Sequence, residues 1–170
     1  MSDEQLLGTT PQVTRILMSE EAIYGLILVS GMIVVSYDLA GTSLNALITV
    51  VVTVIVFFAA HVYAGTLARL AATDGKAGLP ESIRAAAYHS LGMLLISLAP
   101  VAVLLLGVTK AVDDDFAIWC ALTIDAIALG ILGWLAVAKW TRHFWLRLAS
   151  ALLTAAFGGI LILLKALLHH

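Results

Sequence analysis

A chain of 170 residues, of which 62% are apolar and 12% charged, has too little polar surface to cover a globule in water. Its net charge of -2 argues against nucleic-acid binding, which needs a basic patch. The single cysteine, Cys120, can form no internal disulfide and lies in an apolar run, so we interpret it as a small packing residue. The composition therefore predicts an integral membrane protein.

Residues 1–18 form a polar segment without the basic and apolar regions of a cleavable signal peptide. Residues 19–170 are expected to form a single transmembrane domain. Five apolar stretches within it predict transmembrane helices at about 22–37, 44–70, 83–108, 116–139 and 144–168. At 1.5 Å per residue the second helix is about 40 Å long, which exceeds a hydrocarbon core of roughly 30 Å. Its C-terminal end should therefore project from the bilayer.

Polar and helix-breaking residues separate these stretches. Gly41, Thr42 and Ser43 predict a tight turn with an N-cap, and Asp38 is expected to mark the end of the short first span. Pro100, inside the third span, is expected to kink that helix and free a carbonyl. If the first stretch lay in the membrane interface instead of crossing it, the chain would have four spans.

Basic residues are divided unequally between the two ends that these spans predict. One end carries Arg15, Arg69, Lys76, Arg84, Lys139, Arg142 and Arg147, whereas the other carries Lys110 and Lys165. Because cytoplasmic loops are enriched in Lys and Arg, this distribution predicts a cytoplasmic N-terminus and an external C-terminus. The expected fold is an all-α, polytopic bundle of five transmembrane helices in a bacterial inner membrane.

Asp125 is the clearest ionisable residue inside a predicted span. It lies about ten residues, or roughly 15 Å, into the fourth span and so near the bilayer midplane. A charge at that depth costs roughly 3 kcal/mol or more, so it is a functional candidate by default. Asp125 is expected either to bind or relay a proton or cation, or to be a protonated carboxyl that joins helices through Thr123 or the carbonyl freed by Pro100.

Further polar residues are expected at the cytoplasmic ends of the first three spans: Glu20, Glu21, Tyr24, His61 and His89. Antiparallel packing would bring the two histidines to similar depth. Imidazoles and carboxylates are side chains that bind divalent transition metals or relay protons. One interpretation is therefore a metal site with His61, His89 and Glu21 as ligands, or a proton relay through the same residues. The alternative is that these amphipathic side chains lie in the headgroup region.

Small residues recur at every fourth position of the fifth span: Ala151, Ala155 and Gly159. Such a stripe allows two helices to approach closely. It predicts a packing surface, either within the bundle or between subunits.

The layout resembles that of the vacuolar iron transporter family and its prokaryotic relatives. Ile23-Tyr24-Gly25 is similar to the opening of that family's first span, and the run from Phe58 to Tyr63 lies where the family has Met-Ala-x-Gly-Glu-Tyr. Residues 146–164 have a similar texture of Arg, Leu, Ala and Gly. The resemblance implies five spans, an overlong second helix, a proline in the third and a homodimer paired through its first helices.

Several positions depart from the family's pattern. Leu28 stands where the family places its first-span aspartate, and Phe58 and Val62 stand at its second-span methionine and glutamate. About a dozen loop residues replace the cytoplasmic metal-binding helices between spans two and three. If the resemblance holds, His61, one position before Val62 in this motif, is a candidate to replace the family's glutamate ligand.

These features predict a small cation or metal transporter-like protein. Asp125 would bind or relay charge at the midplane, and His61, His89, Glu20 and Glu21 would form the cytoplasmic entrance. The alternative is a non-transporting scaffold or accessory subunit whose polar residues only join helices. A protein that interacts with lipids is a third reading. No nucleophile elbow, phosphate loop or cofactor fingerprint occurs in the sequence, so we do not expect an enzyme.

Overall fold

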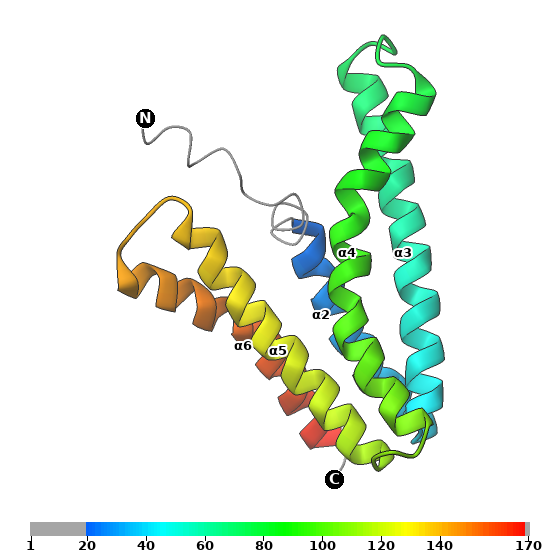
Figure 1. Ribbon diagram of the computed structural model, residues 1–170, viewed down its shortest axis with the longest axis vertical. Coiled ribbons are helices and arrows are strands. Elements are labelled where there is room, and N and C mark those ends of the chain that lie inside the picture. The colour runs from blue at the N-terminus through cyan, green and yellow to red at the C-terminus, as the bar shows by residue number, and fades with distance from the viewer. Residues whose placement is uncertain (1–19, 169–170) are drawn as a thin grey trace, which may run out of the picture.

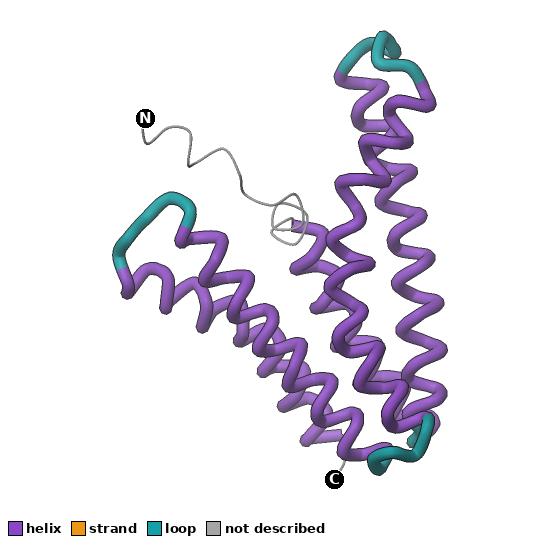
Figure 2. Tube along the Cα trace, viewed as in Figure 1, coloured by secondary structure: helices purple, strands orange, loops and turns teal. Residues whose placement is uncertain are grey.

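The computed structural model describes residues 20–168, which fold into five helices long and apolar enough to cross a membrane. They are α2 (Glu20–Ala40), α3 (Ser43–Ala72), α4 (Leu79–Val108), α5 (Asp114–Ala138) and α6 (Phe144–Leu168). No strand occurs in this part of the chain (Figure 2). The prediction of an all-α protein with five helices of transmembrane length and polarity is thus confirmed for the described residues, and the polar segment 1–18 lies outside them.

The first helix is longer than the sequence predicts. Asp38 does not end it, and α2 continues to Ala40. The helix ends at Gly41, whose φ of +64° is left-handed and therefore easily adopted by glycine. Thr42 then occupies the N-cap of α3, where its side chain accepts a hydrogen bond from the Asn45 amide.

Helix α4 is continuous from Leu79 to Val108 and contains Pro100 as a buried residue. Pro80 lies in its first turn, where the backbone N–H that proline lacks would have no partner within the helix. Gly78, the residue before the first residue of α4, has a φ of +74°.

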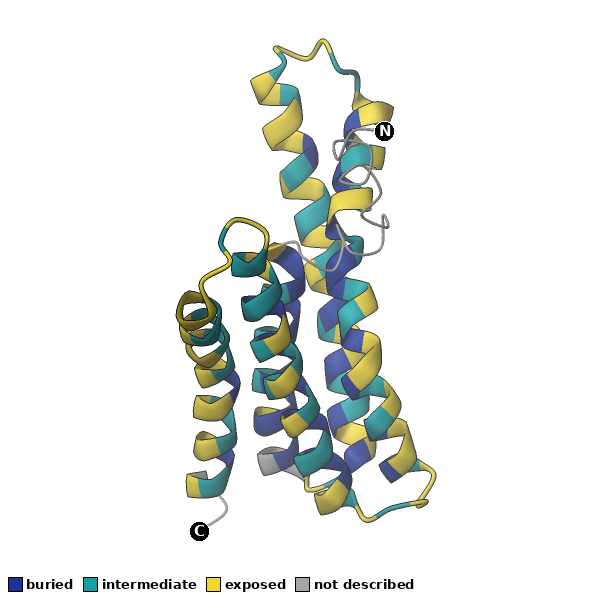
Figure 3. Cartoon of the chain, turned by 60° about the vertical axis from the view of Figure 1, so that its left-hand side comes forward, coloured by how far each residue is buried: buried dark blue, intermediate teal, exposed yellow. Residues whose placement is uncertain are grey.

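Helix α2 is the central element of the bundle (Figure 1). The hairpin α3–α4 packs on one side of it and the hairpin α5–α6 on the other, so that α2 contacts all four other helices. In the apolar window of α2, 56% of the residues are buried, against 11% for α6. Helix α2 is therefore the core helix, whereas most residues of α6 are not buried inside the bundle (Figure 3).

The core follows the buried face of α2. Val29 and Ile33 are fully buried in one cluster with residues of α3, α4 and α5 such as Val50, Leu104 and Ile118. Leu26, also fully buried, lies in a second cluster with residues of α5. Ten polar or charged side chains are also buried among the described residues, and each loses stability there unless it has a hydrogen-bond partner.

The two ends of the bundle differ in charge. The connections α3–α4 and α5–α6 lie at one end, with the start of α2, and those of α2–α3 and α4–α5 lie at the other, with the end of α6 (Figure 2). We call the first the basic end and the second the acidic end. The basic end carries Arg69, Lys76, Arg84, Lys139, Arg142 and Arg147; the acidic end carries Asp113, Asp114, Asp115, Lys110 and Lys165.

The hairpin α3–α4 extends past the other helices at the basic end (Figure 1). Glu21, at the start of α2, bonds to His89, which is ten residues after the start of α4 at Leu79. Ten residues correspond to about 15 Å of helix, so the hairpin projects by about that length beyond α2.

Helices α5 and α6 pack through small residues. Ala151 and Ala155 lie against Gly130 of α5, and Gly158 lies against the α5 backbone. Gly159 does not join this contact, because a Cβ placed on it would meet no atom within 4 Å. Within this chain the small-residue stripe thus runs through Gly158 instead of Gly159.

Candidate functional site

Helix α2 carries three buried polar side chains that bond to neighbouring helices at three depths: Glu21, Ser30 and Tyr37. They are nine and seven residues apart, so about 13 Å and 10 Å of helix separate them. Glu21 lies near the basic end, Ser30 is the central residue of α2, and Tyr37 lies near the acidic end. The candidate site therefore follows the central helix along the whole bundle.

The middle of the bundle contains Asp125, which is fully buried. It lies one residue from the centre of α5, residue 126, as Ser30 lies at the centre of α2. Ser30 Oγ donates a hydrogen bond of 2.8 Å to Asp125 Oδ2. The other carboxyl oxygen, Oδ1, is buried without a hydrogen-bond partner among the described residues.

The sequence identified the depth of Asp125 but not its partner. Thr123 is exposed, and its hydroxyl donates to the carbonyl of Trp119 on its own helix. Ser30 is thus the hydrogen-bond partner of Asp125, in place of Thr123 or the carbonyl freed by Pro100. An unsatisfied buried carboxyl oxygen costs about 1–3 kcal/mol, which a proton or a cation bound there would reduce.

Apolar layers separate Asp125 from both ends of α2. Leu26 and Val29 are fully buried between Glu21 and Ser30, and Ile33 and Val34 are buried between Ser30 and Tyr37. Buried apolar side chains of α2 therefore lie between Asp125 and each end of that helix.

At the basic end, a cavity of about 350 Å³ lies between α2, α3 and α4. Glu21, His61, His89 and Arg69 contribute the polar part of its lining. His89 Nδ1 lies 2.6 Å from Glu21 Oε1, and Glu21 Oε2 is buried without a hydrogen-bond partner among the described residues. We call this space the basic-end cavity.

Hydrogen bonds fix which histidine nitrogens face other groups. His61 Nδ1 lies 3.0 Å from the carbonyl of Phe57, which can only accept, so Nδ1 carries the proton. In a neutral ring the Nε2 atom then has a free lone pair. His89 uses its Nδ1 in the same way, toward Glu21. Each histidine thus keeps one nitrogen for a proton or a ligand.

The structure brings together some of the predicted entrance residues and separates others. Glu21, His61 and His89 line the basic-end cavity, whereas Glu20 is exposed and Tyr24 is 60% exposed in a groove beside α3. Among residues 20–168, no three His, Cys, Asp or Glu side chains form a group that could hold a metal ion. The cavity therefore combines one carboxyl and two imidazole side chains from three helices.

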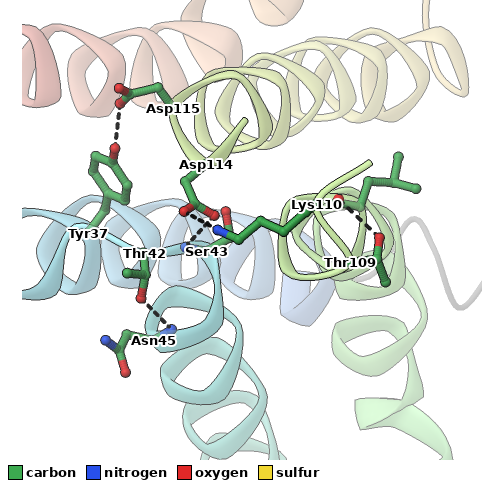
Figure 4. A network of polar contacts seen from close by, with 9 residues as sticks. Tyr37, Thr42, Ser43, Asn45, Thr109, Lys110, Asp114 and Asp115 are labelled. Atoms are coloured by element: carbon green, nitrogen blue, oxygen red, sulfur yellow. Dashed lines mark hydrogen bonds and ion pairs between the residues drawn. The ribbon is translucent and has the colours of Figure 1, made fainter. Parts of the chain in front are cut away.

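At the acidic end, a polar network joins α2, α3 and α5 (Figure 4). Tyr37 donates a hydrogen bond of 2.5 Å to Asp115. Asp114 accepts from the Ser43 amide at 3.2 Å and from Lys110 at 2.7 Å. These contacts connect the start of α5 to the turn between α2 and α3.

Lys165 of α6 is the functional candidate that sequence reasoning missed. Only 4% of its side chain is exposed, and its Nζ has no hydrogen-bond partner among the described residues. The Nζ atom lies 4.6 Å from the centre of the Tyr37 ring, 4.4 Å from that of Trp119 and 3.9 Å from Asp115 Oδ1. A lysine near the end of an apolar span gives no sequence signal that separates it from one that reaches the headgroups.

Comparisons of the chain with protein-family models, curated proteins and solved structures find no match. The resemblance to the vacuolar iron transporter family therefore stays a prediction.

Proposed function

We propose that this chain is a small cation transporter-like membrane protein, in which Asp125 binds a proton or cation and the basic-end cavity is the entrance. Glu21 and His89 would accept the incoming charge, and His61 would offer its free nitrogen. Movement between the cavity and Asp125 would require the apolar layer at Leu26 to open. A transition metal is the less favoured cargo, because no three His, Cys, Asp or Glu side chains among residues 20–168 form a group that could hold a metal ion.

The observation that carries this proposal is that only one of the two carboxyl oxygens of the buried Asp125 has a hydrogen-bond partner among the described residues. A side chain that only joins two helices would be expected to satisfy both oxygens, yet one is bonded to Ser30 and the other has no partner in the described part of the chain. A carboxyl at the centre of a membrane bundle with one oxygen unused is well suited to bind and release a proton or a cation.

The charge difference between the ends supports an orientation. Six basic residues lie at the basic end and two at the acidic end among the described residues. We propose that the basic end faces the cytoplasm of a bacterial cell and that the chain lies in its inner membrane. Two copies would form a homodimer along the exposed groove between α2 and α3 that Tyr24, Leu28 and Phe57 line.

Flux measurements in proteoliposomes test the function. Asp125→Asn keeps the shape of the side chain but cannot exchange a proton, so we expect it to abolish cation-dependent proton flux, read with an internal pH dye under a set potential. Asp113→Asn makes the same change at an exposed position and should leave flux unchanged. Wild-type vesicles that show no flux above empty ones with any small cation would contradict the proposal.

A non-transporting scaffold gives the opposite result. In that case the Ser30–Asp125 bond only holds α2 to α5, and Asn at position 125 would keep the bond and the stability. A stable partner that co-purifies after mild detergent extraction, together with the same lack of flux in the wild type and in Asp125→Asn, would favour the scaffold.

A further inference from the structure

The side chains around Lys165 form a cage with the chemistry of an ammonium-binding site. Two aromatic rings, those of Tyr37 and Trp119, lie within 5 Å of Nζ, and the carboxylate of Asp115 lies at 3.9 Å. Aromatic faces attract cations electrostatically, and cages of such rings recognise alkylammonium groups. Helices α2, α5 and α6 each contribute, so the cage exists only in the folded bundle.

The cage contains a ligand that belongs to the chain itself. Only 4% of the Lys165 side chain is exposed. Its ammonium group nevertheless makes no hydrogen bond with the described residues. An ammonium group has three donors, so the rings and the nearby carboxylate hold it mainly through charge. We propose that Tyr37, Trp119 and Asp115 form a binding site for a small alkylammonium ion, and that Lys165 is the tethered ligand that occupies this site.

The acidic end gives a free ligand access to the cage. Asp115 is 58% exposed, and the neighbouring Asp113 and Asp114 add negative charge at the same end. These carboxylates raise the local concentration of cations. A solute ammonium ion would approach along Asp115 and displace Lys165. This proposal concerns binding alone, and it holds whether or not the chain transports cations.

Competition by Lys165 sets the size of the expected effect. A free ligand binds only to molecules whose cage is empty, so its apparent affinity falls in proportion to that fraction. If Lys165 occupies the cage in about nine molecules of ten, its removal should strengthen binding about ten-fold. Lys165→Ala removes a group of the size and charge of n-propylammonium, which is therefore the matched probe.

The first experiment compares n-propylammonium binding by calorimetry in detergent at constant ionic strength. We expect Lys165→Ala to bind it at least ten-fold more tightly than the wild type, and the further change Trp119→Leu to weaken that binding on the order of ten-fold. Lys165→Met refills the space without charge and should show no gain. Equal affinity in the wild type and Lys165→Ala, or equal binding of the uncharged n-propanol, would overturn the proposal.

A second measurement uses the wild-type protein and so does not depend on a variant that folds. Tetramethylammonium, which cannot react with acylating reagents, should displace Lys165 and raise its acylation at least five-fold, as read by mass spectrometry. Lys110, whose side chain is 71% exposed, is the internal control and should react equally with and without the probe. Unchanged acylation of Lys165 at saturating tetramethylammonium would show that its position is purely structural.

Discussion

Replacing Gly158 with alanine tests the contact between α5 and α6, and its neighbour Gly159 provides a matched control. A Cβ on Gly158 would lie 2.8 Å from both Cα and Cβ of Ala126, whereas one on Gly159 would meet nothing within 4 Å. Favourable carbon contacts lie at about 3.5–4.0 Å, so the two helices would have to separate by roughly 1 Å. Such overpacking costs about 1–3 kcal/mol.

The difference in helix propensity between glycine and alanine does not affect the comparison of the two variants. Both substitutions replace glycine by alanine inside the same helix, so each gains about 0.5–1 kcal/mol and the gain cancels in the difference. We therefore expect Gly158→Ala to have a free energy of unfolding lower than that of Gly159→Ala by about 1–3 kcal/mol.

Reversible unfolding in mixed micelles, with SDS as the denaturant and tryptophan fluorescence as the signal, measures the difference. Trp134 of α5 lies 5.5 Å from Phe144 of α6, between ring centres, and so reports on the same interface. Equal stability of the two variants would show that α5 and α6 do not pack at Gly158. A larger loss for Gly159→Ala would show instead that the small-residue stripe faces a second subunit.

Three further substitutions test local contacts in the same unfolding assay. His89→Ala leaves the Glu21 carboxylate buried without its partner and should cost about 1–3 kcal/mol, and adding Glu21→Gln should restore part of the loss. Lys110→Ala breaks an ion pair with Asp114 in which the lysine side chain is 71% exposed, and it should cost less than about 0.5 kcal/mol, so a loss several times larger would contradict screening of this pair by water. Thr42→Ala removes the N-cap of α3 and should cost about 1 kcal/mol, whereas Thr42→Ser should retain most of the stability.

The helices could be predicted because hydrocarbon imposes simple rules on length and polarity. An apolar run of about 20 residues has to satisfy its backbone hydrogen bonds internally, so it forms a helix whatever its neighbours are. The end of α2 could not be predicted in the same way, because Asp38 breaks the apolar run but not the helix. The backbone continues to the first residue with a left-handed conformation, which is Gly41.

The sequence predicted how deep each site residue lies in the bundle, but not which neighbouring helix its side chain faces. Distance along a helix gives the depth of Asp125 and the common level of Glu21 and His89. Which side chain reaches a neighbour depends on rotation about the helix axis, at about 100° per residue. Glu21 therefore faces the basic-end cavity, and Glu20, one residue earlier, is exposed. Ser30 was missed because its partner lies 95 residues away on a helix whose position no local pattern specifies.

Rotation about the axis of α2 also explains how its polar groups act together. Glu21 and Ser30 are nine residues apart, so they point to nearly opposite sides of the helix. Glu21 bonds to α4 in one hairpin and Ser30 to α5 in the other. Helix α2 thus makes one side-chain bond to each hairpin, and the hairpins also pack directly against each other through α4 and α5. The basic-end cavity and the Asp125 site therefore each include a side chain of the same helix, Glu21 in the cavity and Ser30 at Asp125.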